Sequence, residues 1–151
     1  MSHHRLVLIA TAGSMLLLGG AFLFQLAGYP PCKMCLWQRW PHAAAIVIGA
    51  LCIALKIRAL AWLGALAALA TAAVGLYHAG VEQRWWEGPS TCSSGSTIGK
   101  SVDELLESIL AAPLVRCDEI AWQLAGLSMA GWNAVFSLVL AVIWLAAARR
   151  A

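Results

Sequence analysis

Charge is scarce in this sequence. Ten Lys and Arg residues and seven Asp and Glu residues make up 11% of the 151 residues, and the net charge is only +3. Soluble domains carry about 25% charged residues, and nucleic-acid-binding domains carry a marked excess of basic ones. Hydrophobic residues make up 62% of the chain. This composition excludes a disordered chain and a nucleic-acid partner, and it gives more apolar surface than a soluble globule of this length buries.

The few charges leave four long stretches with none. A membrane-spanning helix needs about 20 apolar residues, within about 17–25, and three of the stretches satisfy this. The second falls just short, and it spans if the flanking Arg39, Lys56 and Arg58 extend their charged tips to the interfaces. The polar faces that helices of soluble bundles show are missing. We therefore predict an all-α integral membrane protein, a single domain 1–151 whose four-helix bundle spans at about 6–27, 40–56, 59–81 and 120–148.

The orientation of the spans follows from the connecting loops. The first stretch is interpreted as a helix rather than a signal peptide, because its apolar part exceeds the usual length of about 7–15 residues and no clear cleavage site follows. Basic residues are densest at the two termini and in the short 56–58 connection, which predicts both termini inside. The loops at about 28–39 and 82–119 are then on the outer side of the membrane.

Four of the five cysteines fall in these outer loops. Cys32 and Cys35 lie in the first loop, and Cys92 and Cys117 lie in the second. Cysteines in a non-reducing compartment pair with one another, so an even outer set indicates two disulfides. The fifth, Cys52, falls inside the second span, where a small apolar thiol is unremarkable and inert.

The first two cysteines form a C-x-x-C motif at the start of a helix. Pro31 precedes Cys32 and suits a first helical position, and helical spacing puts Cys35 and Arg39 on one face. A nearby cation and the positive end of the helix dipole favour the thiolate of Cys35, the form that thiol exchange and electron donation need. The motif alone fits redox chemistry and a structural disulfide or metal site equally. A second close cysteine pair, typical of zinc sites, is missing, and so are nucleotide-binding motifs.

The long outer loop divides into two parts. Glycine, serine and proline surround Cys92, which predicts a flexible and accessible segment. Ser101 and Glu104 then form a capping-box pair, and apolar residues at helical spacing predict a short amphipathic helix that Pro113 ends. Such a helix lies on the membrane surface or caps the bundle through its own packing.

Aromatic residues gather near the predicted outer interface. They fit an aromatic belt, and one of them is alternatively a platform for a flat ring ligand. His78 lies near the outer end of the third span, one turn before Glu82, and by itself fits an ordinary interfacial residue. The tryptophans concerned are Trp37, Trp40, Trp85, Trp86 and Trp122.

Three segments together resemble one known family. Residues 32–41 read CKMCLWQRWP, which resembles the C-x-x-C-x-x-Q-R-x-P motif of the DsbB family of bacterial disulfide bond formation proteins. Residues 77–82 and 86–92 are similar to the end of that family's third helix and its second outer loop, and Cys117, Trp122 and 126–129 to the lead into its fourth helix. The resemblance covers nearly the whole chain. It departs at His42, where many members carry an aromatic residue, a difference that bears on quinone preference.

The resemblance implies a membrane thiol:quinone oxidoreductase that sustains disulfide bond formation. Family members reoxidise the periplasmic dithiol oxidase DsbA and pass the electrons to membrane quinone. On this sequence, the resemblance implies that the DsbA thiolate attacks a Cys92–Cys117 disulfide at Cys92. A Cys32–Cys35 disulfide would then exchange with the reduced Cys92 and Cys117 and restore their disulfide.

At the quinone end, Cys35 would donate to bound ubiquinone or menaquinone beside Arg39, with His78 as a further residue of the quinone pocket. No metal is expected. The implied location is the bacterial inner (cytoplasmic) membrane as a multi-pass protein, with both termini cytoplasmic and the catalytic loops periplasmic. The quinone pool, a DsbA-like oxidase and the lipid bilayer are the expected partners.

Three alternatives remain open at this point. A quinone enzyme similar to the vitamin K epoxide reductase family also combines such helices with a C-x-x-C, but its loop cysteines precede that motif, and here they follow it. A non-catalytic membrane protein with two structural disulfides would resist mild reductant and reduce no quinone. A metal-binding membrane sensor would contain metal when purified, and its potential ligands are scarce here.

Overall fold

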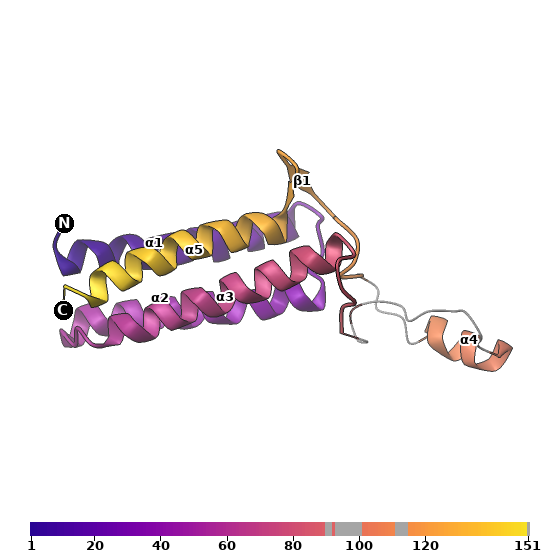
Figure 1. The fold of residues 1–151 in the computed structure, drawn as a ribbon, viewed down its shortest axis with the longest axis horizontal. Helices are drawn as coiled ribbons and strands as arrows, with labels where there is room; N and C mark the ends of the chain where they lie inside the picture. The colour runs from indigo at the N-terminus through magenta and orange to yellow at the C-terminus, as the bar shows by residue number, and fades with distance from the viewer. Residues whose placement is uncertain (90–91, 93–100, 111–114, 151) are drawn as a thin grey trace.

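The chain folds into a bundle of four long helices, shown in the computed structural model of Figure 1. The structure describes residues 1–89, 92, 101–110 and 115–150. The helices form a closed ring in which α1 and α3 each pack against α2 and α5. All four are long and apolar enough to cross a membrane, which confirms the predicted membrane bundle. They are α1 (His3–Leu26), α2 (Lys33–Leu55), α3 (Leu60–Glu82) and α5 (Met129–Ala148).

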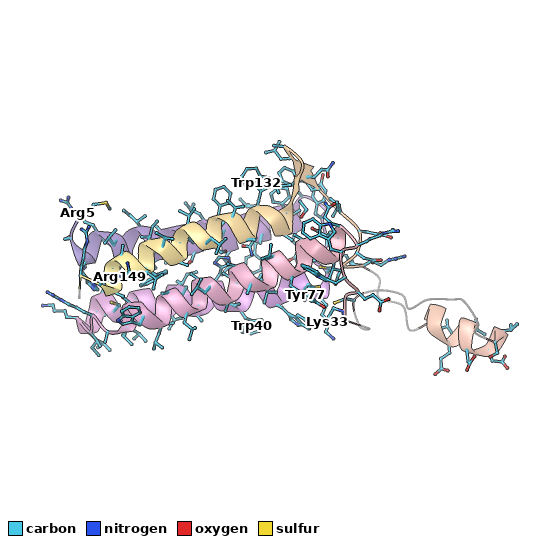
Figure 2. The ribbon with its side chains drawn as sticks, in the orientation of Figure 1. Arg5, Lys33, Trp40, Tyr77, Trp132 and Arg149 are labelled. Atoms are coloured by element: carbon cyan, nitrogen blue, oxygen red, sulfur yellow. The ribbon has the colours of Figure 1, made fainter. Side chains whose placement is uncertain are left out.

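The two ends of the bundle carry different parts of the chain. Both termini and the α2–α3 connection lie at one end, and the α1–α2 and α3–α5 connections lie at the other (Figure 1). In Figure 2, Arg5 and Arg149 mark the first end, and Lys33 and Tyr77 lie toward the second. Large apolar side chains such as Leu66 and Val142 are exposed, which is typical of a helix bundle surrounded by lipid.

Small residues allow the helices to approach closely. A Cβ atom at Gly64 of α3 would lie 2.6 Å from the ring of Trp144 on α5, and one at Gly49 of α2 would collide with Thr11 of α1. Because lipid is as apolar as leucine, such close packing is a main source of helix association in membranes. The glycines therefore set the distances between helices.

Helix α2 begins at Lys33, earlier than the span predicted at about 40–56. Cys32 is its N-cap, and the backbone N–H of Cys35 donates to the Cys32 sulfur over 3.2 Å. The helix ends at Leu55, followed by Lys56 in the left-handed conformation with φ of 57°. The span predicted from charge-free residues begins later than the helix, because α2 includes the charged residues Lys33 and Arg39 near the membrane interface.

Helix α5 begins at Met129, later than the predicted start at about 120. The preceding residues form a short antiparallel hairpin of β1 (Gln123–Leu124) and β2 (Leu127–Ser128). Ala125 and Gly126 at its turn both have positive φ, 51° and 80°, as a tight hairpin turn requires. Ser128 then caps α5, since its hydroxyl accepts from the Gly131 N–H over 3.1 Å. An uncharged stretch does not by itself distinguish hairpin from helix.

The predicted helix of the long loop is present as α4 (Val102–Leu110). Its capping box is confirmed, because the Ser101 N–H donates to Glu104 Oε2 over 2.8 Å and the Glu104 N–H donates to Ser101 Oγ over 3.4 Å. Figure 1 places α4 beyond the end of the bundle. Leu106 and Leu110 on it are exposed, so these side chains do not cap the bundle. The position of this helix on the membrane surface stays a prediction. Pro113, which is expected to end the helix, lies outside the described residues.

Candidate functional site

The structure brings all four loop cysteines to one end of the bundle. Cys32, Cys92 and Cys117 are buried in one cluster with Met34 and Val81, and Cys35 packs against it. The cysteines come from two connections that are distant in the sequence. The predicted outer pairs are therefore neighbours in space, opposite the end that holds the termini (Figure 1).

The segments that hold the later two cysteines are joined to each other. The backbone N–H of Cys117 donates to the carbonyl of Cys92 over 2.8 Å, and that of Cys92 donates to Pro89 over 2.8 Å. Beside Cys117, Arg116 contacts Asp118 over 2.6 Å, and this hydrogen bond lowers the pKa of the Asp118 carboxyl. The hydrogen bond between Cys117 and Cys92 therefore joins the two segments to each other.

The prediction that Cys92 is accessible is wrong. Its exposed fraction is 0%, because it belongs to the buried cluster that also contains Met34 and Val81. The composition of the surrounding sequence indicates turns, and it carries no information on which residue of the segment folds inward. Residues 90–91 and 93–100 on either side lie outside the described part of the chain.

Within the C-x-x-C pair, Cys32 is the hydrogen-bond donor. Its sulfur lies 2.8 Å from that of Cys35. This hydrogen bond, and then burial, raise the pKa of the Cys32 thiol above its usual value. Cys32 therefore keeps its proton and points it at the sulfur of Cys35, which is the acceptor of the pair.

Arg39 shares a cavity with Cys35, but its guanidinium is bound to α1. Nη1 donates to Gln25 Oε1 over 2.8 Å, Nη2 donates to the Ala21 carbonyl over 3.3 Å, and the group lies 4.8 Å from the centre of the Phe22 ring. The buried Nε has no partner among the described residues. The helical spacing correctly predicted that Cys35 and Arg39 lie on one side of α2. It did not indicate that the Arg39 guanidinium binds to residues of α1.

His78 lies directly behind the cysteine pair. Its Nε2 is 3.5 Å from the Cys32 sulfur and 3.9 Å from Glu82 Oε1, and its Nδ1 is 2.9 Å from Gln38 Nε2. Ser128 donates to the other oxygen of Glu82. Since the Gln38 amide donates to Nδ1, the hydrogen of a neutral His78 ring is assigned to Nε2, facing the sulfur.

The same residues offer a partial metal site. One ligand atom each from Cys32, Cys35 and His78 lies within 4.8 Å of the others. A closed structural zinc site has four ligands, so this cluster is one short. Moreover, the Nε2 hydrogen of His78 occupies the position that a metal would take.

A buried polar network connects His78 to the interior of the bundle. Gln38 Oε1 is 2.7 Å from Asn133 Nδ2, and Asn133 Oδ1 is 2.9 Å from His42 Nε2. Thr71 Oγ1 lies 3.2 Å from the same Asn133 nitrogen. Sequence reasoning missed Asn133 and Thr71, although a polar residue within a spanning helix is itself a functional signal.

A cavity of about 390 Å³ opens beside this network, lined by residues of all four long helices and of the segment before α5. Its size falls in the range of small-molecule sites, about 300–1,000 Å³. Of the five interfacial tryptophans, Trp122 lines it and packs edge-to-face on Phe24 with ring centres 5.2 Å apart. The polar or reactive side chains on its wall include Cys35, Arg39, His42, His78 and Asn133.

The comparison with known proteins agrees with this arrangement. The family model described as disulfide bond formation protein DsbB matches residues 3–147. The chain belongs to the DsbB family. Family membership supports a role in disulfide bond formation and disfavours the vitamin K epoxide reductase alternative.

Curated relatives match over nearly their whole length. The disulfide bond formation protein B of Albidiferax ferrireducens is 29% identical over 94% of this chain and 87% of its own. That of Verminephrobacter eiseniae is 31% identical over 93% and 82%. Disulfide bond formation protein B 2 of Pseudomonas aeruginosa is 28% identical over 94% and 89%. No solved structure matches this chain at a significant level.

Proposed function

We propose that this protein is a thiol:quinone oxidoreductase of the bacterial inner membrane. It takes electrons from a DsbA-like periplasmic oxidase and passes them to ubiquinone or menaquinone, with both termini in the cytoplasm. The observation that carries the proposal is the position of the four cysteines. They meet at one end of the bundle, and Cys35 also lines the cavity between the helices.

The first step is exchange with the partner. A thiolate of the partner attacks Cys92 of a Cys92–Cys117 disulfide, forming a mixed disulfide and releasing Cys117 as a thiolate. The second thiol of the partner then attacks its own sulfur, so the partner leaves oxidised and Cys92 and Cys117 are both reduced. Because Cys92 is fully buried, its segment has to move outward for the first attack.

The second step transfers the electron pair inward. The reduced loop pair attacks a Cys32–Cys35 disulfide, the loop disulfide forms again, and Cys32 and Cys35 are left as thiols. The common buried cluster of the four residues supports this exchange. The Nε2–H of His78, 3.5 Å from the Cys32 sulfur, stabilises negative charge there as the bond breaks.

The cavity suits a quinone ring in both size and chemistry. Its apolar walls include Phe24, Trp122 and Phe136, while Arg39 Nε and His42 Nδ1 are buried polar atoms with no partner among the described residues. A membrane quinone supplies an acceptor of two electrons and two protons. Arg39 would hold a ring oxygen, and Cys35 would give up the electron pair as the Cys32–Cys35 bond forms and both thiol protons leave.

The reduction potential of the partner requires a strongly oxidising electron acceptor such as a quinone. The partner oxidase DsbA has a potential of about −120 mV, and each 30 mV of a two-electron couple corresponds to about 1.4 kcal/mol. Reoxidation of so strong an oxidant proceeds only with a more oxidising final acceptor. A lipid-soluble quinone meets this need from within the bilayer.

The test is quinone reduction by the purified protein. Reduced DsbA and a short-chain ubiquinone are mixed with it in detergent, and the quinone absorbance is followed. One quinone should be consumed for each DsbA disulfide formed. Absence of quinone loss, with disulfides that resist mild reductant, would show a structural protein instead. The same assay with menaquinone identifies the preferred acceptor.

A further inference from the structure

His42 is a buried histidine in the middle of the bundle that also lines the cavity. Its Nε2 lies 2.9 Å from Asn133 Oδ1 and 3.5 Å from Ser137 Oγ, whereas its buried Nδ1 has no partner among the described residues. A buried polar nitrogen without a partner in a cavity wall indicates a ligand that supplies one. Which ligand fits depends on whether Nδ1 carries a hydrogen.

Two backbone carbonyls fix the direction of the network around His42. The Met34 carbonyl lies 3.3 Å from Gln38 Nε2, and the Gln38 carbonyl lies 3.1 Å from Thr71 Oγ1. A carbonyl oxygen only accepts, so the atom of the Gln38 side chain near Met34 is its nitrogen. For the same reason, Thr71 donates its single hydroxyl hydrogen to the Gln38 carbonyl.

This direction passes through Asn133 to His42. Gln38 Oε1 and Thr71 Oγ1 are then both acceptors. One atom of the Asn133 amide lies 2.7 Å from the first and 3.2 Å from the second, so this atom is the nitrogen. The other Asn133 atom, facing His42, is then the oxygen. His42 therefore donates from Nε2, and its neutral ring carries a lone pair at Nδ1.

A lone pair at Nδ1 distinguishes the two redox states of a quinone. The oxidised ring presents carbonyl oxygens, which only accept, and the reduced ring presents hydroxyl groups, which donate. The Arg39 Nε–H donates to an oxygen of either state. His42 Nδ1 binds the reduced ring alone.

We propose that His42 is a specificity-determining residue of the cavity, which accepts a hydrogen bond from a hydroxyl of the reduced quinone. The proposal rests on the proposed quinone reductase function. A pocket that binds the reduced ring more tightly than the oxidised ring favours reduction of the bound molecule by the same factor. His42 thereby helps this protein to oxidise a partner that is itself strongly oxidising. Asn133 acts as the positioning residue that fixes the tautomer.

Equilibrium binding of a short-chain ubiquinol and the matching ubiquinone tests the proposal. A Cys35→Ser background prevents turnover, so each ring stays in its own redox state. Since a neutral hydrogen bond contributes about 0.5–1.5 kcal/mol, His42→Phe should weaken ubiquinol binding about threefold to tenfold and change ubiquinone binding less than twofold. His4→Phe, the same substitution at an exposed position near the N-terminus, is the control and should change neither.

The tautomer is measured separately, on the unmodified protein. Nitrogen-15 NMR of the histidine rings should show a protonated Nε2 and an unprotonated Nδ1 for His42, and Asn133→Leu should abolish this preference. The opposite tautomer in the unmodified protein overturns the proposal. So does a His42→Phe variant in which the affinities for ubiquinol and ubiquinone fall equally, or in which neither affinity falls. If the unmodified protein binds no quinone and reduces none, the proposed function itself is wrong. If it reduces quinone and His42 has no effect, only this inference is wrong.

Discussion

His78 Nε2 and the sulfur of Cys32 lie 3.5 Å apart, although 46 positions separate the two residues in the chain. The contact joins the N-cap of α2 to the last turn of α3, and Gln38 orients the histidine from its other side over 2.9 Å. A buried N–H donor thus lies beside the sulfur that must leave as a thiolate when the loop cysteines exchange with the C-x-x-C pair, with Glu82 Oε1 3.9 Å from the same nitrogen.

Removal of this donor should slow the internal exchange. A hydrogen bond to a charged group contributes about 1.5–3 kcal/mol, so His78→Phe should reduce the rate of loop-pair reoxidation about tenfold to a hundredfold. His78→Gln, which keeps an N–H, should restore part of it. Stopped-flow mixing with reduced DsbA, quenched at intervals by a thiol-alkylating reagent, gives this rate. Equal rates in both variants and the unmodified protein would contradict the assigned role.

Cys35 should be indispensable for electron delivery to quinone. Cys35 and Cys32 both line the cavity, and Cys35→Ser removes the sulfur proposed to give up the electron pair. Quinone reduction should therefore fall to the background rate, while a mixed disulfide with DsbA still forms. Cys52→Ser is the matched control, since Cys52 is buried at the opposite end near His3 and should leave turnover unchanged. Undiminished quinone reduction in Cys35→Ser would exclude the proposed route.

The loop cysteines should differ in their reaction with the partner. If Cys92 is the residue that joins the partner, the Cys92 thiol of Cys117→Ala should exchange with a DsbA variant that lacks its resolving cysteine and carries thionitrobenzoate on the remaining one. Thionitrobenzoate leaves as the mixed disulfide forms, and Cys92→Ala should not give this adduct. Non-reducing electrophoresis detects the adduct. Because Cys92 is fully buried, we also expect the adduct to form more slowly than with a small disulfide reagent. Adduct formation by Cys92→Ala alone would reverse the assignment.

Close packing of α3 on α5 should be sensitive to a single methyl group. A Cβ at Gly64 would lie 2.6 Å from the Trp144 ring, whereas one at Gly19 meets nothing within 4 Å. Overpacking costs about 1–3 kcal/mol, so Gly64→Ala should lower the free energy of unfolding by that amount, and Gly19→Ala should leave it unchanged or raise it. Thermal unfolding in detergent compares the two. Equal midpoints of thermal unfolding for the two variants would mean that α3 and α5 accommodate the added methyl group without loss of stability.

Much of the fold could be predicted from charge spacing alone, because a bilayer penalises charge and unpaired backbone so strongly that few arrangements remain. The boundaries could not, since the hairpin before Met129 and the early start of α2 depend on local caps and turns. The same limit applies to Cys92. The turn-forming residues around Cys92 are visible in the sequence, but its burial depends on a cluster that includes Met34 of α2 and Val81 of α3.

The site shows a similar division. A motif is local, so the closeness of Cys32 to Cys35 and the presence of Arg39 on the same helix could be predicted. The network through Asn133 could not, because it depends on contacts between residues 38, 71 and 133, which lie on three helices. Sequence reasoning missed Asn133, and the rarity of a carboxamide in an apolar helix is the one signal that could have indicated a role for it.

Arg39 should affect affinity for the quinone more than the chemistry of the thiols. Its terminal nitrogens are fixed by Gln25 and Ala21 of α1, so the head group is already oriented, and the unpartnered Nε is available to a ring oxygen. Arg39→Ala should raise the KM for ubiquinone about tenfold or more, since hydrogen bonds to charged groups contribute about 1.5–3 kcal/mol. Arg39→Lys retains the charge and lacks the fixed fork, so it should recover only part of the affinity. The rate of mixed-disulfide formation with DsbA serves as the internal control and should not change. A KM that is unchanged in Arg39→Ala would place the ring elsewhere in the cavity.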